Sequence, residues 1–209
     1  MMNLMIKICS LPLIASLIPC MALTAQSPWE LKKDKDSIFI YSRSSQDSKF
    51  NEMKVVFGLR GNFAQLRSIL EDIPHYHEWA YATKTSTIIE KRSANEVVYY
   101  SEVAAPWPFS NRDFYSNTRI WLDSAGEQMR VSSHCVSENY PQKTNLVRMR
   151  LLRAEWKVSM LSPLQLQVEY ILVWNPGGSI PAWLANLFST TGPYQTFTQL
   201  RKKMAGLNP

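Results

Sequence analysis

The chain has 209 residues, of which 45% are hydrophobic, and a formal net charge of +6. A basic chain can bind nucleic acid, or it can approach the anionic headgroups of a membrane surface. The basic residues are scattered, alternate with acidic ones over residues 32–36, and form no aromatic and basic RNA-binding motif. We therefore expect no nucleic-acid partner, and transient contact with a membrane is the interaction that we expect instead.

The N-terminal residues predict a signal peptide. Lys7 is followed by an uncharged apolar run over residues 8–23, which is too short and too interrupted for a membrane span. Cleavage after Ala25 fits best, and cleavage after Ala22 is the second choice. We therefore expect residues 1–25 to be removed and the protein to be exported, either to the periplasm or as a secreted protein.

Residues 26–209 are expected to form one domain, because a chain of about 180 residues fills a single sizeable core and no linker or repeat divides it. Cys135 is the one cysteine in this part, so no intramolecular disulfide can form. Cys20 ends a sequence similar to a lipobox, but Pro19 fits poorly where a small residue is expected. Lipidation is therefore the minor alternative.

Hydrophobic periodicity predicts helices and strands before residue 80. Met53, Val55 and Phe57 alternate as in a half-buried strand, whereas apolar residues after residue 62 recur every three or four positions as in an amphipathic helix. The expected elements are a helix over 28–33 with Ser27 as N-cap, strands over 38–43 and 52–59, and a helix over 63–72 with Asn62 as N-cap.

Long consecutive strands with short polar turns predict an antiparallel meander in the middle of the chain. These strands are expected over residues 83–92, 96–104, 112–123, 128–138, 146–155 and 164–174. A helix follows over residues 181–206, and its apolar stripe is wide enough to cover one mouth of the sheet. The Gly192-Pro193 step predicts a kink or brief break in this helix.

Two proline-containing connectors carry the most informative motifs. Residues 106–113 read Pro-Trp-Pro-Phe-Ser-Asn-Arg-Asp, and the two prolines favour an extended corner anchored by its tryptophan. Residues 174–181 read Trp-Asn-Pro-Gly-Gly-Ser-Ile-Pro, a sharp turn that feeds the last helix. The residues expected to shape these motifs are Trp107, Arg112, Asp113, Pro176, Gly177, Gly178 and Pro181.

These motifs resemble the START family of lipid-transfer domains, over roughly residues 28–206. That family carries a Pro-x-Pro-x-x-x-Arg-Asp corner before a central strand and a Pro-Gly-Gly-x-Ile-Pro turn before its C-terminal helix. The resemblance implies an α+β, helix-grip (START/Bet v 1-like) fold, in which a curved antiparallel sheet wraps around a long C-terminal helix with an internal apolar cavity. It also implies a monomer that binds a lipid or other hydrophobic small molecule without a cofactor.

Glu102 is the most suggestive polar residue. On its expected strand it shares a mostly apolar face with Tyr100, so both side chains should lie in the cavity if that face points inward. In a member of the family that the chain resembles, a matching glutamate pairs with an arginine at the position of Thr118. Two alternatives follow for Glu102: it faces a ligand, or it pairs with another basic residue. The residues expected at the ligand are Tyr100, Glu102, Thr118, Met149, Leu184, Leu187, Phe188, Thr191 and Phe197.

Other candidate chemistry has simpler structural explanations. His75 and His77 lie beside Glu78, but they follow a proline at a helix end without an evident third ligand, so no metal site is expected. His134 and Cys135 are neighbours on a strand and should point to opposite faces. The phosphate-binding and nucleophile motifs of common enzymes are absent from the sequence.

Three functions follow from these observations, with non-catalytic lipid binding or transfer as the main hypothesis. An enzyme of the cyclase or hydrolase kind on the same scaffold would use Glu102 as a general base, and turnover would distinguish it. An adaptor for another protein would show a large exposed apolar patch. Arg112 and Asp113 can grip a headgroup or lock their corner to neighbouring loops, and the second interpretation is favoured.

Overall fold

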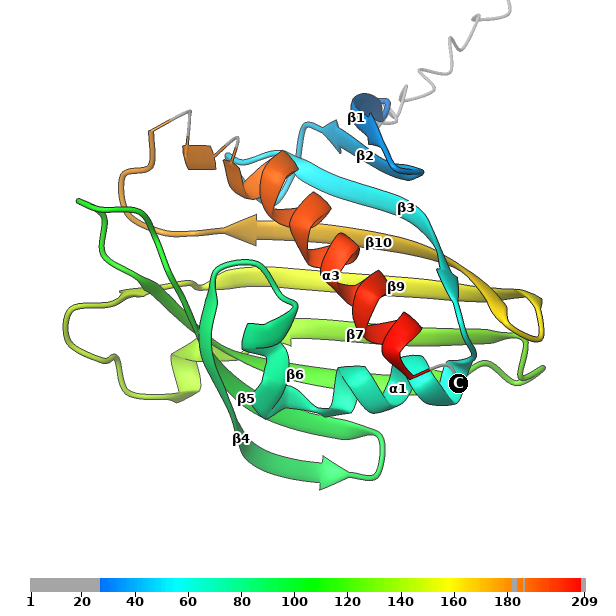
Figure 1. Ribbon diagram of the computed structural model, residues 1–209. Coiled ribbons are helices and arrows are strands. Elements are labelled where there is room, and N and C mark those ends of the chain that lie inside the picture. Colours follow the sequence, from blue (N-terminus) through cyan, green and yellow to red (C-terminus); the bar gives the residue numbers. More distant parts are fainter. Residues whose placement is uncertain (1–26, 182–183, 186, 208–209) are drawn as a thin grey trace, which may run out of the picture.

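The computed structural model describes residues 27–181, 184–185 and 187–207, so the expected signal peptide lies outside the described residues. A curved, ten-stranded sheet dominates the fold (Figure 1). Along the sheet the order is β1-β2-β3-β10-β9-β7-β6-β5-β4, all antiparallel, while β8 pairs in parallel with β6. The strands are β1 (Glu30–Lys35), β2 (Ile38–Arg43), β3 (Glu52–Arg60), β4 (Thr83–Ser93), β5 (Glu96–Val103), β6 (Arg112–Leu122), β7 (Gln128–Cys135), β8 (Val147–Arg148), β9 (Leu151–Ser162) and β10 (Gln165–Asn175).

One face of this sheet is covered by helices, and α3 crosses it diagonally with α1 near its C-terminal end (Figure 1). The helical elements are α1 (Phe63–Glu71), α3 (Gly192–Gly206), the 3-10 helices η1 (Ile73–Glu78) and η2 (Ser137–Asn139), and the π-helix η3 (Leu187–Thr191). The predicted helix-grip architecture is therefore confirmed. The sheet is open, with β1 and β4 at its edges.

The core lies between α3 and the strands. In register, Val168 of β10 lies opposite both Phe57 of β3 and Val158 of β9, and all three are buried on the face toward α3. The rings of Phe57 and Phe197 are 4.5 Å apart between centroids. A buried side chain of this size contributes about 1.5–3 kcal/mol by leaving water, so α3 is part of the core as well as a cover. The buried apolar residues of α3 are Phe197, Leu200 and Met204.

The predicted start of α1 is confirmed, and its side chains explain why the helix begins there. Asn62 accepts a hydrogen bond from the backbone N–H of Gln65 at 3.0 Å, and the Gln65 side chain accepts one from the Asn62 N–H at 3.0 Å. This reciprocal capping box satisfies two backbone donors that the helix itself leaves unpaired. Leu66, Ile69 and Leu70 then face the core.

The C-terminal half of α3 is fastened on two sides. Arg201 donates hydrogen bonds to the carbonyl oxygens of Gly58 on β3 and Ser37 in the β1–β2 turn, at 3.0 and 2.9 Å. On another side, Lys203 forms an ion pair with Glu78 at the end of η1. These contacts tie the last helix both to the sheet and to the segment after α1.

The expected helix over residues 28–33 is wrong, because residues 30–35 form strand β1. Asp36 and Ser37 have φ values of 53° and 54°, the left-handed conformation of a tight hairpin turn. This turn folds β1 back onto β2 and supplies ladder hydrogen bonds. Pairing with a neighbouring strand therefore overrides the local helical preference.

The expected strand boundaries between residues 128 and 155 are also wrong. Strand β7 ends at Cys135, residues 136–146 form an irregular segment with η2, and β9 begins only at Leu151. The short strand β8 leaves the meander to pair with Arg112 and Asp113 at the start of β6. The expected break at Gly192 falls at the boundary between η3 and α3.

Candidate functional site

A cavity of about 230 Å³ lies between the sheet, η3 and α3. Its wall is formed by inward-facing residues of β3, β5, β6, β7, β9 and β10, by the segment around η1, and by one side of α3. The wall is largely aromatic. The aromatic residues on it are Tyr76, Trp79, Tyr81, Tyr99, Phe114, Trp156, Tyr170, Phe188 and Phe197.

The hydroxyl groups on this wall are mostly paired with each other or with the backbone. Thr118 Oγ1 lies 2.7 Å from Ser133 Oγ, and Ser101 Oγ lies 3.0 Å from Ser86 Oγ. Thr196 Oγ1 accepts a hydrogen bond from a backbone N–H at 3.0 Å. The protein thus satisfies these polar groups without a ligand.

Burial makes the hydroxyl groups of three wall tyrosines harder to deprotonate. Desolvation raises the pKa of Tyr99 to about 12, although the nearby hydroxyls of Ser116 and Thr118 act in the opposite direction. Desolvation likewise raises the pKa of Tyr170 and of Tyr76 above its ordinary value. The tyrosines therefore act as neutral hydrogen-bonding groups near neutral pH.

The cavity wall carries no charged side chain among the described residues. The indole N–H of Trp79, one of the lining residues, is buried without a partner in the described structure. Trp79 is 6% exposed and packs edge-on against Tyr76, with 5.1 Å between ring centroids. The arrangement suits an apolar molecule with few polar atoms.

Three of the residues expected at the ligand lie on this wall: Thr118, Phe188 and Phe197. Met149 is buried in a neighbouring cluster with Phe114. Leu184 is fully buried and Thr191 is partly buried, but neither is on the wall. The side chain of Leu187 lies outside the described part of the structure. A role in ligand binding stays a prediction for each of them.

The expectation that Tyr100 and Glu102 face the cavity is wrong. Tyr99 and Ser101 of β5 point to the cavity, so Tyr100 and Glu102 point to the opposite face. Tyr100 packs there against Tyr115 and Val136, and this cluster makes the outer face of β5 apolar as well. Because both faces of the strand are apolar, alternation alone cannot identify the inner one.

Glu102 has basic and polar partners on the outer face. Its Oε1 accepts hydrogen bonds from Lys84 Nζ at 2.9 Å and from Asn111 Nδ2 at 2.7 Å. The hydrogen bond from Lys84 is the main cause that lowers the pKa of Glu102, and burial opposes it. Glu102 is therefore an ion-paired residue beside the β5–β6 connector, and the cavity lacks the general base proposed for an enzyme.

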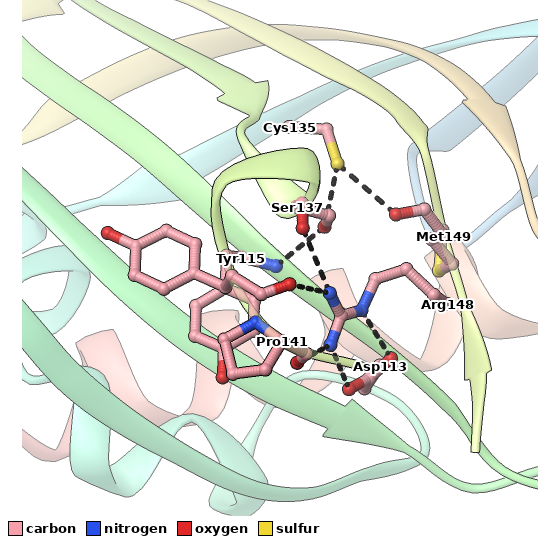
Figure 2. Close-up of polar contacts among 8 residues, drawn as sticks. Asp113, Tyr115, Cys135, Ser137, Pro141, Arg148 and Met149 are labelled. Atoms are coloured by element: carbon pink, nitrogen blue, oxygen red, sulfur yellow. Dashed lines mark hydrogen bonds and ion pairs between the residues drawn. The ribbon is translucent and has the colours of Figure 1, made fainter. Parts of the chain in front are cut away.

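The Arg-Asp motif locks its corner, as favoured from the sequence. Asp113 is fully buried and binds Arg148 through two hydrogen bonds of 2.8 and 3.0 Å (Figure 2). The same guanidinium donates to the carbonyl oxygens of Ser137, Tyr140 and Pro141 at 2.9–3.1 Å. This network pins the segment after β7 to the start of β6.

Arg148 was missed by the sequence analysis. It is 35 residues from its partner, and the two-residue strand β8 to which it belongs is too short to give a periodic signal. The nearest available signal was Asp113 itself, because a carboxylate on an apolar strand requires a cationic partner.

The remaining motif residues have structural roles, with one correction. Gly177 has φ +70°, and a Cβ there would lie 3.1 Å from Val147 Cγ1 and 3.2 Å from the Arg148 carbonyl oxygen, so the turn requires glycine. Gly178 is also left-handed, at φ +61°. Trp107 does not anchor its corner, because its side chain is 92% exposed. Arg112, in contrast, is buried.

The motif prolines flank the second connector. Pro176 directly precedes the two left-handed glycines. The carbonyl oxygen of Pro181 accepts hydrogen bonds from the N–H groups of Leu184 and Ala185, both at 3.1 Å. The sharp turn expected over residues 174–181 thus leads directly into helical hydrogen bonding.

The histidines form no metal site in the described part of the chain, where no group of three or more candidate ligands occurs. His75 Nδ1 lies 2.6 Å from Asp72 Oδ1, and His77 Nδ1 lies 3.0 Å from the carbonyl oxygen of Pro74. Cys135 Sγ donates a hydrogen bond to Ser137 Oγ, at 3.0 Å.

Comparison with known proteins agrees with the fold and the motifs. Residues 20–207 match the START domain family. The chain belongs to this family. Within the described residues, no helix is both long and apolar enough to cross a membrane.

Individual relatives cover most of the chain. An uncharacterized protein of Pseudomonas aeruginosa is 29% identical over 83% of this chain and 85% of its own length. The phosphatidylcholine transfer protein of Mus musculus is 30% identical over 78% of each chain. Among solved structures, the STAR-related lipid transfer protein of Xanthomonas axonopodis superposes with a TM-score of 0.76 and 26% identity, covering 85% of this START domain and 98% of that chain.

Proposed function

We propose that this START domain binds one hydrophobic molecule in the cavity under α3 and carries it without changing it. The observation that supports this proposal most directly is the aromatic, uncharged wall of the cavity. Removing apolar surface from water contributes about 25 cal/mol per Å², so an enclosed apolar molecule gains affinity from burial alone. The name of the mouse relative, a phosphatidylcholine transfer protein, agrees with a lipid as ligand.

Catalysis is the less supported alternative. The described cavity wall carries no Asp, Glu, His, Lys or Cys, so its serine and threonine hydroxyl groups have no general base on the wall to activate them as nucleophiles. The residue proposed as general base, Glu102, lies on the opposite face of β5. These positions favour binding and release over a chemical step.

Delivery of a lipid requires contact with a membrane, and the connector between β5 and β6 supplies a candidate surface. Trp107 is the most exposed large apolar residue of the described part, and a proline stands on each side of it. Tryptophan partitions to the interface between headgroups and acyl chains. We therefore propose that this connector touches the membrane transiently, that the protein acts as a monomer, and that it does so after export.

Native mass spectrometry of the protein purified from the cells that make it tests the main proposal. We expect a mature chain that begins near Gln26, in monomeric form, with one hydrophobic molecule bound. Incubation should return that molecule with unchanged mass. Recovery of a chemically altered product would show that the domain is an enzyme, and a retained Met1 would contradict export.

A further inference from the structure

One buried charge in the described part of the chain lacks a partner of opposite charge. The buried charged residues there are Glu52, Arg112, Asp113 and Arg148. Glu52 forms an ion pair with Arg43 at 2.6 Å, and Asp113 forms one with Arg148 at 2.8 Å (Figure 2). Arg112 is 4% exposed, its Nη1 donates to the carbonyl oxygen of Ser110, and its Nε is buried without a partner. Because an unpaired buried ion is costly to desolvate, an anion from outside the fold would stabilise this guanidinium.

Arg112 lies on the inner face of β6. Side chains alternate along a strand, so Arg112 shares its face with Phe114 and Thr118, which line the cavity. In register, Arg112 lies opposite Val103 of β5, and Val103 lies opposite Thr83 of β4. Thr83 also lines the cavity. The cavity therefore reaches the row of residues to which Arg112 belongs, although Arg112 itself is not part of the wall.

The neighbouring carboxylates do not face Arg112. Asp113 points to the outer face of β6, where both of its carboxylate oxygens bind Arg148 (Figure 2). Glu102 of β5 lies on the same outer face with partners of its own. Burial lowers the pKa of Arg112, whereas the hydrogen bond to Asp113 raises the pKa of Arg148. An arginine nevertheless keeps its charge at neutral pH, so Arg112 is a permanent cation on the cavity side of the sheet.

We propose that Arg112 binds an oxyanion, either a carboxylate or a phosphate, which reaches it from the cavity side. The proposal rests on the binding function proposed above, and it places the charge of a bound molecule one step beyond the uncharged wall. A guanidinium binds carboxylates and phosphates through paired N–H donors, and the buried Nε supplies one of them. The oxyanion is either the head group of the lipid or a free ion, and the two sources are separated below.

Three probes with the same alkyl chain test the proposal on wild-type protein stripped of bound lipid. These probes are hexadecanol, hexadecanoic acid and hexadecyl phosphate, offered one at a time at about pH 8, where both acids are ionised. Hexadecanol measures the contribution of the chain without charge. We expect the two anions to bind at least about tenfold more tightly than hexadecanol, because hydrogen bonds between ionised groups are the strong ones.

The variant Arg112→Met tests the residue, since it removes the charge and keeps an apolar side chain. We expect the preference for the two anions over hexadecanol to disappear in this variant. Arg119→Met is the matched control, because it removes the same charge from the same strand at an exposed position on the outer face. The control should keep the wild-type preference. An equal loss of preference in both variants would indicate long-range attraction and overturn the proposed site.

Urea unfolding of the lipid-free proteins distinguishes a binding arginine from a structural one. Arg112→Met should unfold at the same urea concentration as the wild type or a higher one, because it removes a buried charge that has no partner. A lower midpoint together with an unchanged preference for anions would make Arg112 structural and overturn the proposal. If this variant fails to fold, Arg112→Lys replaces it, which keeps the charge and removes Nε. A smaller preference than in the wild type would then support the proposal, and an unchanged one would overturn it.

Inorganic phosphate separates the two sources of the oxyanion. For a free-ion site, phosphate alone should raise the urea midpoint of the wild type but not of Arg112→Met, with the three lipid probes bound equally. For a head-group site, the preference among the lipid probes appears instead. Equal binding of the three probes without any effect of phosphate would overturn the oxyanion site and leave lipid binding intact. Failure of the folded wild type to bind any probe, phosphate included, would overturn both.

Discussion

At the scale of single residues, the Asp113–Arg148 pair shows how a charge can serve the fold in a lipid-binding domain. Both side chains are buried, and the guanidinium also binds three backbone carbonyl oxygens (Figure 2). The pair is costly to desolvate, but it fixes the segment after β7 in one place. That segment covers the outer face of β5 and β6, and it excludes water from Tyr100.

Removing one partner should therefore be strongly destabilising. Asp113→Asn leaves the Arg148 charge buried and unpaired, so we expect a loss of about 3–5 kcal/mol in the free energy of unfolding, measured with urea. The exposed pair of Arg153 with Asp47, at 2.7 Å, is a matched control. Asp47→Asn should cost less than about 1 kcal/mol. Losses of equal size in both variants would contradict the argument.

Glu102 gives a smaller effect that depends on pH. Its pKa in the folded protein is lowered below the ordinary value of 4.5, mainly by the hydrogen bond from Lys84, so the carboxylate stabilises the fold above the unfolded pKa. We expect Glu102→Gln to lose less than about 1 kcal/mol at neutral pH, because Lys84 is half exposed. The difference from the wild type should vanish as the pH falls through the lowered pKa.

The ligand bound by that variant should be unchanged, since Glu102 lies outside the cavity. The measurement is the mass of the bound molecule together with urea unfolding at several pH values. A changed set of bound lipids would place Glu102 in ligand recognition after all. A stability difference that grew in acid would contradict the assigned direction of the pKa shift.

At the scale of elements, the connectors divide into buried and exposed parts. The β5–β6 connector ends in the buried Arg112 and Asp113, but its middle presents Trp107 to solvent between two prolines. Prolines restrict the backbone, so this exposed ring is held on a stiff support and loses little conformational freedom when it meets a surface.

Trp107→Ala should weaken binding to vesicles that contain anionic lipid by at least about tenfold, because roughly 100 Å² of aromatic surface leaves water when the ring enters the interface. Vesicle co-sedimentation and the rate of lipid transfer between vesicles measure the effect. Leu161→Ala is the control, since Leu161 is also exposed but lies at the end of β9. An identical loss in both variants would indicate general hydrophobic adhesion.

At the scale of the whole molecule, the sheet and the last helix could be predicted because alternation, turns and helical spacing are local signals. The cap at Asn62 belongs to this class. The face of β5 that points to the cavity could not be predicted from the sequence. The segment that covers the outer face of β5 comes from beyond β7 and makes both faces of the strand apolar. Strand β1 was missed for a related reason, since its identity depends on pairing with β2.

The position of α3 also sets an order of assembly. Every strand precedes α3 along the chain, yet Phe197, Leu200 and Met204 of α3 complete the core of the sheet. While the ribosome is still adding these residues, the strands that precede them have no partner for their inner face, and that face is apolar. The domain therefore cannot mature strand by strand during synthesis, and folding is completed only when its last helix arrives.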